Sequence, residues 1–275
     1  MTVALSTQPL SILAAGGEGG GLKFPPVENL VKWPAWFLEG TVFEFNKIAF
    51  INFVAFIVPV VLFFIVSRKP AAVPRGLQNL MESAIDFIDV QVIKPAIGPD
   101  GKRYLPMLLA MFFYIWIGNL FEIIPTAHMP ANARIANPLI LAIVALVMFI
   151  GVGVKHHKLG YFKEVLFPPG VPKALYILVT PIELLSTFII RPFSLAVRLF
   201  ANMTAGHVLL AIFAIMTNEL AISRNSGTFQ LIFAPLPFLG LIAFTAFELL
   251  VAVLQAFIFT ILTAVYINES AHAEH

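Results

Sequence analysis

The sequence contains two apolar runs that are too long for ordinary membrane helices. Residues 174–217 and 229–267 contain no polar loop. As helices rising 1.5 Å per residue, they would be about 66 and 58 Å long, whereas the hydrocarbon core of a bilayer is about 30 Å thick. Each run must therefore tilt steeply, bend at its prolines, or cross the membrane twice. Because polar loops are absent, we expect a hairpin of two long, strongly inclined helices joined by residues 218–227.

The composition indicates an integral membrane protein. The chain has 275 residues, of which 59% are hydrophobic and 12% charged, whereas soluble domains carry about 25% charged residues. The net charge of +2 gives no basic surface for nucleic acid, so no nucleic-acid partner is expected. There is no cysteine, which excludes disulfides and iron–sulfur clusters. No cofactor, metal site or catalytic residue is expected.

The fold class predicted from these patterns is an all-α membrane protein with about five transmembrane helices. Residues 1–46 are expected to form an extramembrane or interfacial segment, and residues 47–275 a single membrane domain. That domain is predicted to contain the long hairpin over 174–267 and three shorter spans, at residues 48–66, 104–124 and 139–154. An amphipathic surface helix is predicted at residues 76–94.

The distribution of Lys and Arg predicts the orientation. Loops after the first and third spans are richer in basic residues than the segments on the other side. Basic loops stay cytoplasmic, so we expect the N-terminus outside and the C-terminus in the cytoplasm. The sequence shows no inverted or tandem repeat, and such repeats are common in secondary transporters.

Arg198 is the residue of the hairpin whose side chain is least favourable inside a bilayer. A guanidinium at the centre of a bilayer costs about 2.5–3.5 kcal/mol on insertion scales. Ser194, Arg198 and Asn202 follow the spacing i, i+4, i+8 and share one helix face. No acid on the same helix lies one turn from Arg198. Unless Glu248 folds back to it, its counter-charge is expected from another chain.

Further polar side chains occur in the same hairpin, and each has a structural alternative. Arg191 could neutralise Glu183 or reach the membrane surface. His207 points to a different neighbour from Arg198 and could form a purely structural pair with Glu248. Asn202 and Gln255 could serve only as hydrogen bonds between helices.

Three segments resemble subunit a of the F-type ATP synthases, the stator of a rotary motor. They are "RPFSLAVRLFANMTAGH", "LLVAVLQAFIFTILTAVYI" and "GNLFEIIP", and the likeness extends over nearly the whole chain from about residue 47. The resemblance implies a non-catalytic subunit that forms two proton half-channels beside a ring of c subunits and couples proton flow to ring rotation and ATP synthesis.

The resemblance also implies roles for particular residues. Arg198 matches the arginine that faces the ring carboxylate. The entry half-channel would contain His207, Glu248, Asn202, Gln255 and Glu122, and the exit side Ser194 and Glu183. Many bacterial relatives carry Glu and His in the reverse order at the positions of His207 and Glu248, an exchange that keeps one acid and one imidazole.

The partners implied are the c ring, b-type subunits of the peripheral stalk, the remainder of the synthase, lipid and protons, in a bacterial plasma membrane. Two other classes of protein are compatible with parts of the sequence. A stand-alone ion-coupled transporter would use Arg198 to bind an anionic substrate, and a structural membrane anchor would leave Arg198, His207 and Glu248 without a role.

Overall fold

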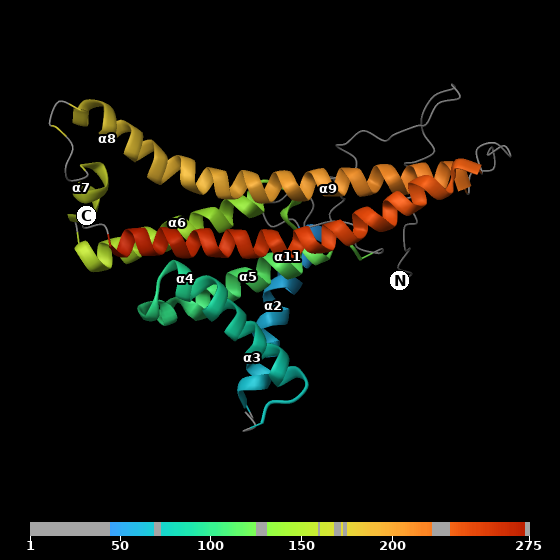
Figure 1. The fold of residues 1–275 in the computed structure, drawn as a ribbon, viewed down its shortest axis with the longest axis horizontal. Coiled ribbons are helices and arrows are strands. Elements are labelled where there is room, and N and C mark those ends of the chain that lie inside the picture. Colours follow the sequence, from blue (N-terminus) through green and yellow to red (C-terminus); the bar gives the residue numbers. More distant parts are fainter. Residues whose placement is uncertain are drawn as a thin grey trace.

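The computed structural model of the chain describes residues 45–68, 73–124, 131–158, 160–167, 172, 175–221 and 232–272. The predicted segment 1–46 therefore lies almost entirely outside the described residues. All the described elements are helices (Figure 1), which confirms the predicted fold class. Five of the described helices are long and apolar enough to cross a membrane, in agreement with the sequence.

The first part of the chain supplies three membrane helices and the amphipathic segment. Helix α2 is Lys47–Arg68, and α3 Leu77–Ile88 continues through a π-helical segment, η2 Asp89–Ile93, into α4 Lys94–Ala96. A 3₁₀ turn, η3 Pro99–Tyr104, leads into α5 Leu105–Leu120, and η4 Ala131–Ala133 precedes α6 Ala136–His157. A short helix, α7 Gly160–Leu166, forms where the sequence suggested only a basic loop.

The observed spans differ from the predicted ones at their ends. Helices α2 and α6 extend beyond the predicted 48–66 and 139–154. The prediction of a helix to residue 124 was wrong, because α5 ends at Leu120 and residues 121–123 form a turn. Glu122 therefore lies in a turn beyond the helix. The amphipathic segment packs against α2, α5 and α11, with Met81 and Ile88 buried.

The last two apolar runs form the predicted hairpin. The first consists of α8 Tyr176–Leu185, the π-helical segment η6 Ser186–Ile190 and α9 Arg191–Ala221, and the second is α11 Pro235–Ala271. Figure 1 shows α9 and α11 side by side along the longest dimension of the molecule, with α8 diverging from α11. Each run is one continuous helical stretch, so neither forms two spans. Part of the predicted connection, residues 222–227, lies outside the described residues.

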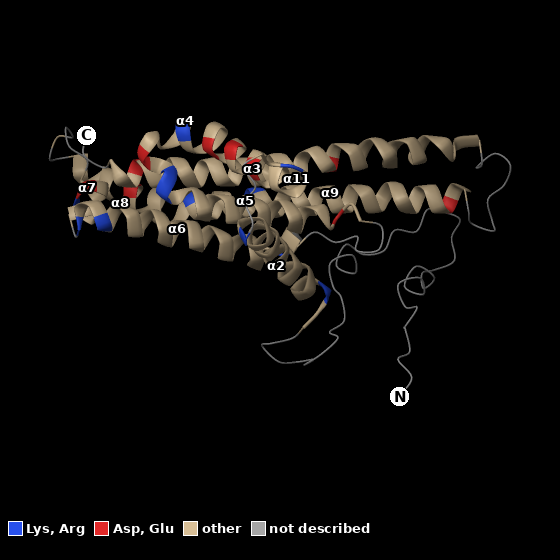
Figure 2. Ribbon diagram, turned by 90° about the horizontal axis from the view of Figure 1, so that it is seen from below, with Lys and Arg blue, Asp and Glu red and all other residues tan. Residues whose placement is uncertain are grey.

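The other helices support the hairpin from one side. Helix α11 packs against α5, α6 and α9, and α9 also packs against α6 and η4. The hydrophobic core is formed mainly by α5, α6, α9 and α11, with Phe112, Phe149 and Phe259 among its buried side chains. Figure 2 shows that Lys, Arg, Asp and Glu gather at the end of the molecule near α7, whereas the opposite part of the hairpin is nearly free of them.

Candidate functional site

One face of α9 points away from the rest of the chain. Ser194, Arg198, Ala201 and Ala205 are exposed and recur at intervals of three or four residues. The opposite face is buried in the core through Leu195, Ala196, Leu199 and Met203. The predicted sharing of a face by Ser194 and Arg198 is confirmed, and Asn202 lies at the edge of that face, partly buried.

The Arg198 side chain has no hydrogen-bond or ion-pair partner within the described part of the chain. Its surroundings on the outer face of the hairpin are apolar, with Ile190 and Phe193 more than half exposed. The possibility that Glu248 folds back to Arg198 is not realised, because the Glu248 carboxylate lies against Gly206 and is only 4% exposed. An unpaired guanidinium on an apolar surface requires an anion from outside the described part of the chain.

Glu248 of α11 occupies a space that a glycine leaves free. A Cβ atom at Gly206 would overlap the Glu248 carboxylate. His207, the next residue of α9, is buried as well. Two helices from distant parts of the sequence thus bring an acid and an imidazole to the same stretch of their interface.

Glu122 joins these two residues from the turn after α5. It is 2% exposed, and it lies close enough to Glu248 for the charges of the two carboxyl groups to interact. One oxygen of each carboxyl group has no hydrogen-bond partner among the described residues. The structure therefore gathers Glu122, His207 and Glu248 in one buried region, on the side of α9 opposite to the exposed face.

Gln255 extends this region along α11. It is buried, and Ala252 lies between it and Glu248 on the same buried stripe of the helix. Residues seven positions apart in a helix are nearly aligned. Among the described residues, no three His, Asp or Glu side chains are placed to hold a metal ion.

A network of asparagines beside Glu122 was not identified from the sequence. Asn132 donates to Asn119 (2.6 Å) and Asn137 donates to Asn132 (2.8 Å). The Tyr114 hydroxyl group and the amide of Asn137 both approach the Asn52 carbonyl oxygen at 3.1 Å. The backbone N–H of Glu122 donates to the carbonyl oxygen of Asn119 at 3.1 Å, so the network ends at the turn that carries the carboxyl group. Asparagines inside apolar spans were the signal that could have revealed it.

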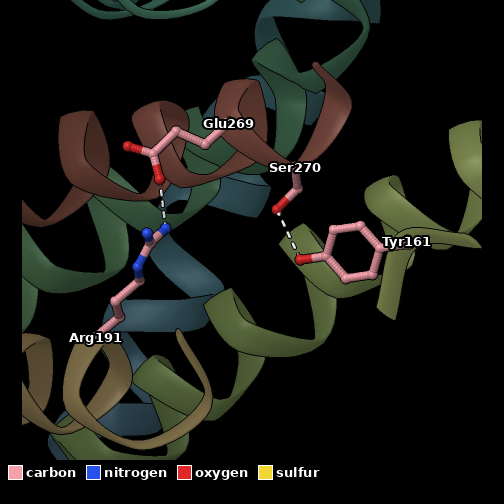
Figure 3. Close-up of polar contacts among 4 residues, drawn as sticks. All are labelled: Tyr161, Arg191, Glu269 and Ser270. Atoms are coloured by element: carbon pink, nitrogen blue, oxygen red, sulfur yellow. Dashed lines mark hydrogen bonds and ion pairs between the residues drawn. The ribbon is translucent and has the colours of Figure 1, made fainter. Parts of the chain in front are cut away.

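The end of the hairpin near α7 contains a separate group of polar contacts (Figure 3). Arg191 forms an ion pair with Glu269 of α11. The Arg191 guanidinium also lies 5.1 Å from the centre of the Tyr266 ring. Tyr161 of α7 hydrogen bonds to Ser270 at 3.1 Å.

The alternative that paired Arg191 with Glu183 was wrong. Glu183 lies on α8, beyond the π-helical segment η6, and forms no ion pair with Arg191. Glu183 and Ser194 are not part of the buried region around Glu248. They belong to the other side of the hairpin, where Ser194 is exposed and Glu183 partly so.

Comparison with known proteins agrees with this geometry. The sequence model of the family described as "ATP synthase A chain" matches residues 48–268. The ATP synthase subunit a of Frankia alni is 43% identical over 256 residues, which cover 91% of this chain and 87% of the relative. That of Rhodococcus erythropolis is 43% identical, with 88% of both chains covered, and that of Streptomyces lividans is 36% identical, with 99% and 97% covered. The chain therefore belongs to the family of ATP synthase subunit a, the non-catalytic proton-channel stator of the F-type enzyme.

Proposed function

We propose that the exposed face of α9 meets a ring of c subunits and that Arg198 supplies the counter-charge for one ring carboxylate at a time. The observation that carries the proposal is the Arg198 guanidinium, exposed among apolar side chains and without a partner in the described part of the chain. Ala201 and Ala205 are exposed on the same face, and their small side chains let another helix approach closely.

Glu122, Glu248 and His207 form the entry half-channel in this proposal. A proton from the outer aqueous phase passes among these groups and neutralises a ring carboxylate. Asn202 and Gln255 provide polar contacts between the buried region and the exposed face. A neutral carboxyl group can enter lipid at a far lower cost than an ionised one, so the protonated subunit turns away from the stator.

The exit half-channel lies on the other side of Arg198, past Ser194 and Glu183 towards the cytoplasm. A carboxyl group that arrives there loses its proton, and the resulting anion is attracted to Arg198. Because arginine stays protonated in proteins, it also prevents a proton from passing directly between the half-channels. Each proton that crosses 100 mV releases about 2.3 kcal/mol, which drives rotation.

The length of the hairpin supports a position along a curved partner. Helix α11 has 37 residues, which corresponds to about 56 Å, so it must lie strongly inclined in a core about 30 Å thick. An inclined pair of helices can follow the wall of a cylindrical ring and leave two offset openings. Membership of the family argues against the two alternative classes of protein, a stand-alone transporter and a structural membrane anchor.

We place the chain in a bacterial plasma membrane, with its N-terminus outside and its C-terminus in the cytoplasm. The bacterial relatives support the membrane. The Lys and Arg residues near α7 support the orientation (Figure 2), because basic residues are retained on the cytoplasmic side. Membership of the family also supports b-type subunits of the peripheral stalk as partners in the assembled synthase.

The proposal is tested by ATP-driven acidification of inverted vesicles in sodium-free buffer. Wild type should acidify the vesicle lumen, and Arg198→Ala should abolish acidification although the complex assembles. Arg75→Ala, which removes an exposed loop arginine, should have no effect and is the matched control. Pumping near the wild-type rate in Arg198→Ala would show that the assigned role is wrong, and a strict need for sodium would show that the ion is wrong.

A further inference from the structure

Helix α9 carries two arginines, and only one of them is free to attract a ring carboxylate. Arg191 and Arg198 are separated by two turns, about 10.5 Å along the helix, and lie on nearly the same stripe. The Arg198 side chain is unpaired within the described residues, whereas Arg191 is bound by Glu269.

Helix α11 holds Arg191 with two side chains from its last turns. The Glu269 carboxylate accepts a hydrogen bond from the guanidinium (Figure 3). The guanidinium also lies 5.1 Å from the centre of the Tyr266 ring. A hydrogen bond between Tyr161 and Ser270 connects the same end of α11 to α7. The ion pair is not sealed from its surroundings, since 27% of the Arg191 side chain and 49% of the Glu269 side chain are exposed.

The other acid on this side does not take part. Glu183 lies eight residues before Arg191, about 12 Å further along the helix, and forms no ion pair with it. Glu269 is thus the group that balances the Arg191 charge among the described residues. Without Glu269, the exposed side of the hairpin would present two unbalanced cations at neighbouring positions.

We propose that Glu269 neutralises Arg191 so that a passing ring carboxylate encounters a single attracting cation, Arg198. The inference rests on the proposed function of Arg198. An unbalanced Arg191 would offer the deprotonated carboxylate a second resting place and delay its movement to Arg198. Glu269 and Tyr266 are positioning residues in this view, because they act on the ring through Arg191.

The test uses four variants in the complete synthase: Glu269→Gln, Arg191→Gln, the double variant, and Asp89→Asn as the control. Asp89 pairs with Lys94 at 3.2 Å on the amphipathic segment, so its variant frees a cation away from the exposed face of α9. The readouts are the amount of assembled complex and ATP-driven proton pumping per assembled complex in inverted vesicles.

Glu269→Gln should lower pumping about tenfold, while Arg191→Gln and the double variant should stay within about twofold of wild type. Asp89→Asn should pump normally. Recovery in the double variant is the decisive result, because a purely structural ion pair is lost equally in all three variants. Normal pumping by Glu269→Gln, or a double variant as slow as Glu269→Gln, would overturn the proposal.

Two further outcomes remain decisive. Glu269→Gln could fail to assemble. In that case, a double variant that assembles and pumps supports the proposal, and a double variant that also fails to assemble overturns it. Arg198→Ala in the same vesicles separates the two claims. If that variant pumps, the proposed function fails. If it is inactive and Glu269→Gln pumps normally, only the neutralisation of Arg191 fails.

Discussion

At the scale of single residues, Gly206 provides the space in which the Glu248 carboxylate lies. A Cβ atom in Gly206→Ala would overlap that carboxylate. The carboxylate is the end of a flexible side chain, so we expect it to move aside without loss of the fold. Misplacement of a proton-carrying group by about 1 Å should lower pumping about tenfold or more.

The matched control is Gly151→Ala. Apart from the backbone of its own helix and its chain neighbours, nothing lies within 4 Å of a Cβ at Gly151, so this change should leave both assembly and pumping unchanged. The measurement is ATP-driven proton pumping by the two variants in inverted vesicles. Equal pumping by Gly206→Ala and Gly151→Ala would show that the position of the Glu248 carboxylate is unimportant.

The pair of His207 and Glu248 leads to a second prediction. His207→Glu places two acids at these two positions, and Glu248→His places two imidazoles there, so in each single variant this pair no longer combines one acid with one imidazole. The double variant restores that combination with the residues exchanged. It should pump faster than either single variant, and pumping no better than the slower one would contradict a shared relay.

At the scale of elements, the asparagine network fixes η4 and the end of α5 beside Glu122. Asn132→Ala removes a donor to Asn119 and an acceptor from Asn137, both inside the protein. We expect a loss of about 1–3 kcal/mol of stability. The purified complex should release the subunit at a lower temperature, whereas the exposed control Asn79→Ala should not. Equal release temperatures would contradict a stabilising network.

Local sequence patterns were sufficient to predict most of the elements. Apolar length predicted the hairpin, and the spacing of Ser194 and Arg198 predicted their shared face, because both depend only on helix geometry. The end of α5 was placed four residues too late, since Phe121, Ile123 and Ile124 are as apolar in a turn as in a helix. The short helix α7 was missed because its basic composition is equally typical of a loop.

Contacts between distant segments could not be predicted in the same way. The sequence offers Glu183, eight residues away, as a partner of Arg191, but the observed partner, Glu269, lies 78 positions along the chain. Nothing in the local spacing identifies such a partner, since it depends on how α9 and α11 cross. The approach of Glu122 to Glu248 and the asparagine network also depend on how distant segments pack, so local spacing does not identify them.

At the scale of the whole molecule, the distribution of charge predicts which end faces the cytoplasm. The chain has no cysteine, so single cysteines can be labelled without background. Val73 and Asn218 are exposed, near the α3 end and the far end of α9, respectively. An impermeant maleimide should label Val73→Cys in inverted vesicles and Asn218→Cys in right-side-out cells. Labelling of each from the opposite side would reverse the orientation.

The contact between the exposed face of α9 and the ring is tested most directly by disulfide formation with a cysteine beside the ring carboxylate. Ala201 is exposed next to Arg198, and Ala196 is buried on the opposite face. With a cysteine in the ring, Ala201→Cys should form a cross-link that stops pumping until a reductant is added, and Ala196→Cys should form none. Absence of a cross-link from Ala201→Cys, or an equal one from Ala196→Cys, would contradict the account.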